Sequence, residues 1–271
     1  ILADIPRSQK RLSIKRWHRL LGELRSMSLA IPGARGLFSH LQAALASHQQ
    51  GRLCLARGFH AALDDFRWLR NDLQNRPTRL SELVPVTPTV VGTHDASGTG
   101  AGGVWLPRPH TILRSVPLQI VTTSNTLNIV IPSLPVPILW RARFPKRIST
   151  DLVSFRNPHG SITNSDLELA GGIINDEAAA QCFDIRERTT KASTDNLATM
   201  YWHRKGSVSS NSAAAYLLRI QALHQRYHRY HPLKDYIPGP KNTMADDASR
   251  LHTLSDPAFL NHFNSTYPQP Q

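Results

Sequence analysis

The sequence changes character near residue 80, and this change most constrains how the chain can fold. Before it, apolar residues recur at helical spacing in residues 17–24 and 59–73. After it, residues 84–91 are rich in valine, and a glycine-rich run follows at 98–103. The first pattern predicts amphipathic helices, whereas the second predicts strands joined by a turn. We therefore expect a small all-helical region of three helices at 1–80, followed by a mixed α/β domain.

The second domain is expected to span residues 84–252. It contains a segment at 107–139 with six prolines, which fits neither a helix nor a strand pair and is interpreted as an irregular insertion. Residues 253–271 are expected to be a C-terminal tail. Periodicity and turn signals predict further strands in 141–155, 185–192 and 235–237, and helices at 165–180, from 196, at 213–227 and from 242.

The charge of the chain is strongly positive and unevenly distributed. The 271 residues carry 32 Lys and Arg against 19 Asp and Glu, a net charge of +13, of which +9 falls within residues 1–80. This excess favours a polyanionic partner, and nucleic acid is the simplest candidate.

Two cysteines exclude a disulfide framework and a four-thiolate zinc site, and no apolar run is long enough to span a bilayer. The chain begins at Ile1 without a leader-like segment, so we expect an intracellular fragment of a longer protein, in the cytoplasm or nucleus.

Four acidic residues stand at the ends of predicted elements. Asp95 follows a strand, Glu168 lies in the first turn of a helix, Asp195 lies between a strand and a helix, and Asp246 begins the last helix. In α/β folds such ends meet at one edge of the sheet, where four carboxylates would repel one another unless divalent cations neutralised them. The pattern predicts a site for two Mg²⁺ ions, of the type that cleaves phosphodiesters.

The segments that contain these residues resemble a known family. They are residues 93–97 (THDAS), 165–170 (SDLELA), 194–196 (TDN) and 242–250 (NTMADDASR). In this order they are similar to the RNase H-like domain in the Pol polyproteins of LTR-type and related tyrosine-recombinase retroelements. The basic helices before them look like the thumb and connection region that follows a reverse transcriptase palm.

The resemblance implies a fold, an activity and a ligand set. The fold would be an RNase H-like mixed five-stranded sheet flanked by helices. The activity would be hydrolysis of the RNA strand of RNA:DNA hybrids with two Mg²⁺ ions, or Mn²⁺ in their place. Asp95 would bridge both ions, Glu168 would favour the ion near the attacking water, Asp246 would favour the other ion, and Asp195 would complete the set. The implied partners are the hybrid and the polymerase palm of the same polyprotein, with no membrane; the oligomeric state stays open.

A basic stretch after residue 200 is the predicted contact surface for the hybrid. Cations there can follow phosphates, while aromatic rings pack against sugars or bases. The predicted cations are Arg204, Lys205, Arg219, Arg226 and Arg229, and the predicted aromatic contacts are Trp202, Tyr227 or Tyr230.

Each acidic residue also has an ordinary structural interpretation. Glu168 can close a capping box with Ser165, Asp195 can cap a helix, and Asp246 can pair with Arg250 one turn later. Asp247 competes with Asp246 as the fourth ligand, and the family register, three residues before the serine of Ser-Arg, selects Asp246.

Two other groups of residues invite a functional interpretation. Asp64 and Asp65 could suggest polymerase metal ligands, but their helical surroundings favour a solvated helix face. His224, His228 and His231 have the spacing of a zinc site, but without a nearby cysteine and with arginines between them they favour a surface that faces nucleic acid.

Three alternative functions remain open. The 73-residue spacing from Asp95 to Glu168 is long for the family, which is consistent with a catalytically inactive remnant that only binds nucleic acid. A structure-selective or exonucleolytic nuclease would use the same fold, because fold alone does not set the substrate. A purely structural subunit that supports a polymerase is the third alternative.

Overall fold

The structure is a computed structural model, and it does not describe every residue. Most of the predicted insertion at 107–139 lies outside the described part; its described residues are 107, 108, 111, 136–139 and two short paired strands, β5 (Gln119–Val121) and β6 (Thr126–Asn128). The described residues are 5–46, 51–55, 57–108, 111, 119–121, 126–128, 136–208 and 213–268.

The first part of the chain forms the three predicted helices around one apolar core. Helix α1 begins after Ser13, whose side chain accepts a hydrogen bond from the Arg16 amide, and four of its apolar residues, Trp17, Leu20, Leu21 and Leu24, are buried on one face. A short antiparallel pair of strands, β1 and β2, joins these helices and was not apparent in the sequence pattern. The elements of this part are β1 (Arg11–Ser13), α1 (Ile14–Ser28), η2 (Ala34–Leu37), α2 (Ser39–Ala46), β2 (Arg52–Cys54), α3 (Arg57–Asn75) and α4 (Leu80–Leu83).

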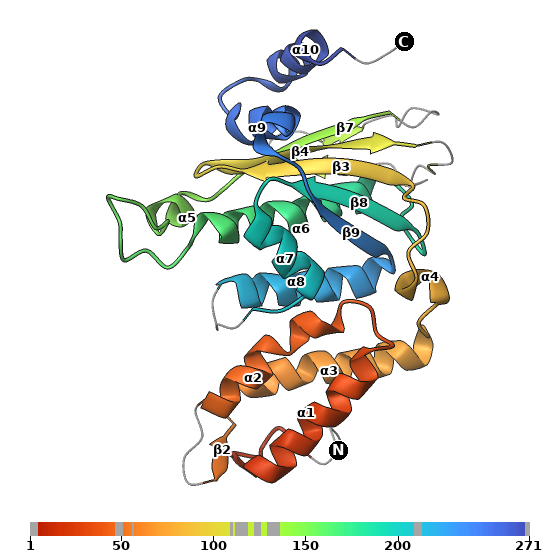
Figure 1. The fold of residues 1–271 in the computed structure, drawn as a ribbon, viewed down its shortest axis with the longest axis vertical. Coiled ribbons are helices and arrows are strands. Elements are labelled where there is room, and N and C mark those ends of the chain that lie inside the picture. Colours follow the sequence, from red (N-terminus) through yellow and green to blue (C-terminus); the bar gives the residue numbers. More distant parts are fainter. Residues whose placement is uncertain are drawn as a thin grey trace.

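Five of the described strands form one mixed sheet in the order β7-β4-β3-β8-β9 (Figure 1). The neighbours β3, β4 and β7 are antiparallel, whereas β8 runs parallel to β3 and β9 runs parallel to β8. The prediction of a mixed five-stranded sheet flanked by helices is therefore confirmed. The strands are β3 (Val90–Ala96), β4 (Gly100–Pro107), β7 (Ile138–Arg143), β8 (Thr189–Thr194) and β9 (His231–Tyr236).

Three details of the strand prediction are wrong. Strands were expected in 141–155, but β7 ends at Arg143 and Lys146–Thr150 form the short helix α5. The valine-rich residues 84–89 connect α4 to the sheet, and β3 begins only at Val90. Gly100 and Gly102, expected in a turn, lie inside β4. At Gly102 a Cβ atom would collide with the backbone of Ala248, so glycine is needed there because a helix crosses the strand closely.

Helices cover both faces of the sheet. Figure 1 shows α6 (Asn164–Cys182) and α8 (Ala213–His228) beneath it and α9 (Thr243–Arg250) above it, with the N-terminal helices packed below α8. The segment predicted to be a tail contains α10 (Asp256–Thr266), whose Phe259 and Phe263 pack on α9. The remaining elements are α5 (Lys146–Thr150), α7 (Leu197–Lys205) and η3 (Gly239–Lys241). In the part of the chain that the structure describes, every helix is too short or too polar to span a bilayer.

Candidate active site

Two neighbouring parallel strands place Asp95 and Asp195 at the same edge of the sheet. Thr93 on β3 pairs with Ser193 on β8, so Asp95 and Asp195, each two residues further on, lie at the same level. Asp95 is buried near the end of β3, and Asp195 follows the last residue of β8 and is half-buried. The convergence of carboxylates expected from strand ends is therefore present for this pair.

Helix α6 brings Glu168 to these two aspartates. The helix is capped by Thr163 and Asp166, which exchange hydrogen bonds between side chain and backbone over 2.8 and 3.2 Å. The alternative in which Ser165 and Glu168 form the capping box is wrong, because the helix begins earlier than the sequence suggested. Glu168 thus lies beyond the first turn, has no role in the cap, and is buried beside Asp95.

Helix α9 separates the two adjacent acids, Asp246 and Asp247. Asp246 lines the same cavity as the other three carboxylates and pairs with Arg250 over 2.7 Å. Asp247 accepts hydrogen bonds from His262, at 3.0 Å, and from the hydroxyl of Tyr267, at 2.9 Å. Asp247 therefore holds the C-terminal segment, and Asp246 faces the site.

The four predicted acidic residues line one cavity of about 420 Å³. Carboxylate oxygens of Asp95, Glu168 and Asp195 lie within 4.8 Å of one another. The cavity is lined by Asp95, Ala96, Ser97, Gly98, Asn164, Glu168, Asp195, Asn196, Asp246 and Arg250. Apart from Arg250, these lining residues carry no positive charge, so the pocket concentrates negative charge in a chain that is otherwise basic.

Burial and mutual repulsion shift the titration of this cluster. Burial, with the nearby charges of Asp95 and Asp195, raises the pKa of Glu168 to about 9. Burial also raises the pKa of Asp95, against the lowering effect of a hydrogen bond from Ser249. The pKa of Asp195 is raised by burial first and then by the charge of Asp246. Three carboxyl groups are thus held in surroundings that disfavour their charge.

The residues present fit a divalent cation. The buried Oε2 atom of Glu168 has no hydrogen-bond partner among the described residues, although buried carboxylate oxygens are normally satisfied. A cation among the carboxylates would supply the missing partner and remove the repulsion that raises the pKa values. Carboxylate oxygens are the ligands that Mg²⁺ and Mn²⁺ prefer.

Several supporting residues were not singled out from the sequence. Ser249 donates a hydrogen bond of 2.6 Å to Oδ2 of Asp95, and the buried Asn242 donates one of 3.1 Å to the carbonyl of His94. Asn196 caps α7 by accepting from the Thr199 amide at 3.0 Å. The signal for Ser249 was its position three residues after Asp246, which places both on one helix face.

The predicted contact surface for nucleic acid is only partly present. The arginines of α8, and Arg229 directly after it, form ion pairs with carboxylates of residues 65–82. Arg219 pairs with Asp65 at 2.5 Å, and Arg229 pairs with Glu82 at 2.7 Å. The prediction is wrong for Arg226, which is buried and pairs with Asp72 at 2.7 Å and with Glu82.

Other predicted contacts differ in exposure. Arg204 and Lys205 at the end of α7 are exposed, so for them the prediction stands as a prediction. Tyr227 is exposed, and Trp202 is half-buried against the cluster of Leu169, Ala214 and Leu218. The prediction is wrong for Tyr230, which is fully buried and donates a hydrogen bond to Asp176.

The paired aspartates of α3 do not form a solvated face. Asp64 pairs with Arg67 at 2.6 Å, but Asp65 is buried and bound by Arg219. The three histidines of the sequence cluster also separate. His231 contacts the Glu82 carbonyl, whereas His224 and His228 face Glu177 on α6.

Comparisons with known proteins concern this architecture. No protein-family model and no curated protein matches the chain. The N-terminal RNase H domain of a Mycobacterium tuberculosis protein, solved as a fusion with maltose-binding protein, is similar at 15% identity and a TM-score of 0.36, over 59% of this chain and 94% of that chain. RNase H1 from Halobacterium salinarum is similar at 15% identity and a TM-score of 0.33, over 59% and 92%. The foamy viral protease–reverse transcriptase in complex with an RNA/DNA hybrid is similar at 9% identity and a TM-score of 0.31, over 88% of this chain and 26% of that chain.

The fold itself is defined by the order and direction of the strands. Antiparallel β7, β4 and β3 are followed by parallel β8 and β9, and α6 and α9 cover opposite faces. With this mixed five-stranded sheet flanked by helices, the chain has an RNase H-like fold.

Proposed function

We propose that this chain is a metal-dependent endonuclease that hydrolyses the RNA strand of RNA:DNA hybrids. One observation carries the proposal: oxygens of Asp95, Glu168 and Asp195 lie within 4.8 Å of one another in a cavity that Asp246 also lines. The motifs that hold these residues supply the substrate class through their resemblance to retroelement RNase H-like domains. The proposed setting is a retroelement reverse transcriptase in the cytoplasm or nucleus, with residues 1–80 as its thumb and connection region.

The four carboxylates would hold two Mg²⁺ ions, or Mn²⁺ in their place. When bound, such ions activate a water molecule and stabilise the leaving oxygen of an in-line phosphodiester displacement. The protein orients the ligands: the hydroxyl of Ser249 holds Oδ2 of Asp95, and the guanidinium of Arg250 holds Asp246. Glu168 has to lose its proton to act as a ligand, because the metal-free site keeps its pKa near 9.

Positive charge outside the cavity would attract the substrate. The net charge of +13 raises the local concentration of a polyanion, and the exposed Lys205 offers a phosphate contact at the end of α7, beside Arg204, whose guanidinium pairs with Asp235 at 3.3 Å. The cavity itself is acidic, so binding and hydrolysis use different surfaces. A hybrid would therefore be held by its backbone while its scissile phosphate meets the carboxylates.

The test is a cleavage assay with matched variants. Purified protein is incubated in Mg²⁺ with an RNA:DNA hybrid, a DNA duplex and single-stranded RNA. We expect cleavage of the RNA in the hybrid, and a loss of at least 100-fold in rate for Asp195→Asn, since this variant weakens the hold on metal ions whose charge is worth several kcal/mol in the transition state. Folding of this variant should be preserved because Asn196, not Asp195, caps α7. Hybrid affinity of the metal-free variant should hold or rise.

Asp247→Asn is the matched control, since it removes an adjacent acid that points away from the cavity. It should keep the cleavage rate. Equal rates for wild type and Asp195→Asn would contradict the assignment of the site. Hybrid binding without any cleavage would favour the inactive remnant, and equal cleavage of DNA duplex would favour a structure-selective nuclease.

A further inference from the structure

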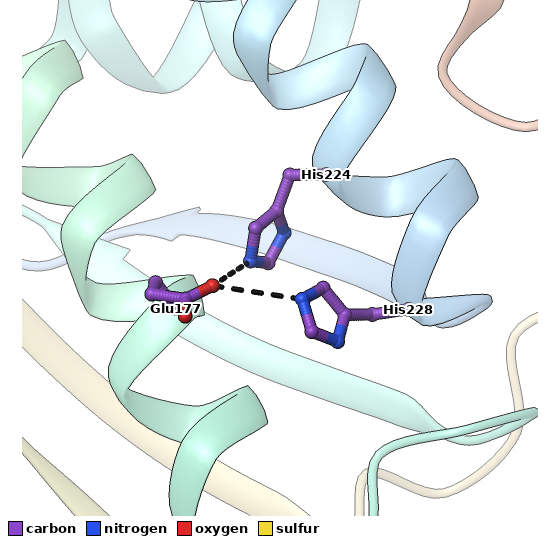
Figure 2. A group of neighbouring side chains, drawn as sticks. All are labelled: Glu177, His224 and His228. Carbon is purple, nitrogen blue, oxygen red and sulfur yellow. Dashed lines mark hydrogen bonds and ion pairs between the residues drawn. The ribbon is translucent and has the colours of Figure 1, made fainter.

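A second group of ligand-type side chains lies between α6 and α8, away from the carboxylate cavity. Figure 2 shows Glu177 of α6 facing His224 and His228 of α8. The Nε2 atoms of His224 and His228 lie 2.9 and 3.5 Å from the same oxygen, Oε2 of Glu177. One ligand atom from each residue lies within 4.8 Å of the other two. On α6, Glu177 is nine residues from Glu168, or roughly 13 Å along the helix axis.

The hydrogen bonds around His224 determine which of its ring nitrogens carries a proton. The ammonium of Lys234 contacts both carboxylate oxygens of Asp176, at 2.6 and 2.7 Å, so Asp176 acts as an acceptor. Tyr230 donates its hydroxyl proton to Asp176 over 3.2 Å. The hydroxyl oxygen can then only accept from Nδ1 of His224, which lies 3.1 Å away.

This arrangement leaves a lone pair on Nε2 of neutral His224 facing the carboxylate of Glu177. Two acceptors at 2.9 Å repel each other unless a cation lies between them. That cation is either a second proton on the imidazole or a metal ion. A ligating histidine whose other nitrogen donates to a fixed polar partner is the arrangement found around protein-bound metals, and here Tyr230 and Asp176 form that partner.

Glu177 is prepared as an anionic ligand. Its Oε1 atom accepts a hydrogen bond from Gln181 one turn later on α6, which leaves Oε2 for the two histidines. Its side chain is 44% exposed, so the site opens to solvent on this side.

We propose that Glu177, His224 and His228 form a Zn²⁺ site whose fourth position is open to water. Two histidines at i and i+4 on one helix with a carboxylate from another make a donor set that suits zinc. Bonds of about 2.0–2.1 Å in a tetrahedral site separate ligand atoms by about 3.4 Å. The two separations from Glu177, 2.9 and 3.5 Å, are close to this value, and all three ligand atoms lie within 4.8 Å of one another, so rotamer adjustments would complete the site.

A metal at this position would link the two helices that lie beneath the sheet. Helix α6 carries Glu168 into the carboxylate cavity, and α8 holds the N-terminal helices through its arginines. Zinc binding would stabilise the native protein by mass action, because the two helices are not held together in the unfolded chain. This inference does not depend on the proposed nuclease activity.

The experiment uses Co²⁺ and Zn²⁺ as probes of the full chain. Mg²⁺ in large excess occupies the carboxylate cavity, and Co²⁺ is then titrated while the visible absorption is recorded. We expect one equivalent of Co²⁺ to give the intense bands of a four-coordinate site with nitrogen ligands, and Zn²⁺ to displace it. Zn²⁺ should also raise the Tm of the wild-type protein in the same buffer.

Three variants separate this site from unspecific binding. His228→Asn and Glu177→Gln should lose the cobalt bands and the Tm shift, with at least a tenfold weaker affinity for zinc. His231→Asn should keep both, since His231 is the third histidine of the sequence cluster but lies at the Glu82 carbonyl. Absent cobalt bands in the wild type, or equal zinc affinity in wild type and Glu177→Gln, would overturn the proposal and leave an ion pair between helices.

Discussion

Among single residues, Glu168 shows most clearly how the surroundings of the site disfavour a charged carboxylate. Its pKa of about 9 in the folded protein exceeds the ordinary value of 4.5, because burial and two neighbouring aspartates disfavour the carboxylate. Between these two pH values the folded state binds a proton that the unfolded state has released. The stability of the metal-free protein therefore falls as pH rises through this window.

Replacing Glu168 by Gln should remove this pH dependence. The decrease in the free energy of unfolding with pH should become smaller by on the order of 1.4 kcal/mol per pH unit within this window, since one proton fewer is bound on folding. The free energy of unfolding in urea, measured between pH 5 and pH 9 with a chelator present, checks this. Glu23→Gln, which changes an exposed acid on α1, should leave the slope unchanged. An equal slope for Glu168→Gln and the wild type would place Glu168 in a more polar environment than the structure does.

The identities of the acidic residues could be predicted from the sequence, but not every neighbour could. Motif order and element ends were enough to select Asp95, Glu168, Asp195 and Asp246, which all line the cavity. The capping residues of α6 were misplaced because Thr163 with Asp166 and Ser165 with Glu168 have the same spacing. Spacing alone cannot choose between two overlapping capping boxes; the position of the helix start decides.

Among the elements, α8 differs most from its sequence-based interpretation. Its arginines were expected to face nucleic acid because they alternate with histidines and tyrosines on a basic helix. Their partners Asp65, Asp72 and Glu82 lie 144 to 154 residues earlier in the chain, so no local pattern could reveal them. A buried arginine and an exposed one look alike in a sequence until the packing partner is known.

Arg226→Met should strongly destabilise the protein. The buried guanidinium binds both Asp72 and Glu82, and without it these largely buried carboxylates would keep only their outer partners, Arg76 and Arg229. Breaking such a pair from one side typically costs about 3–5 kcal/mol. Urea unfolding measures this, with Lys205→Met as an exposed control that should stay within about 0.5 kcal/mol of the wild type. A similar stability for both variants would mean that α3 and α4 do not rely on this ion pair.

For the whole molecule, the positive charge has two separate roles. Part of it is neutralised internally where α8 meets α3 and α4, and part stays on the surface, as in Lys15 and Arg25 of α1. A net charge read from the sequence cannot divide these two portions. The surface portion is what a polyanion would meet.

Hybrid binding should weaken steeply with salt, and changing surface cations should make the dependence shallower. Lys15→Gln with Arg25→Gln keeps the internal ion pairs, so the fold should persist while the slope of log K against log salt falls by about 0.7–0.9 for each phosphate that is no longer neutralised. Fluorescence anisotropy at several salt concentrations measures the slope. An unchanged slope would show that α1 lies away from the substrate. Deleting residues 1–80 is a poorer test, since it removes Asp72 and leaves Arg226 without that partner.

The ion pairs across α8 also bear on how the polypeptide would respond to a protease. Residues 84–89 connect α4 to β3. Ion pairs join the parts of the chain before and after this connection: Asp65 pairs with Arg219, Asp72 with Arg226, and Glu82 with Arg229. A single cut in that connection would therefore leave two fragments that migrate separately on a denaturing gel yet elute together from a sizing column. For this protein, cleavage of the polypeptide in this connection would not by itself separate the two parts of the folded molecule.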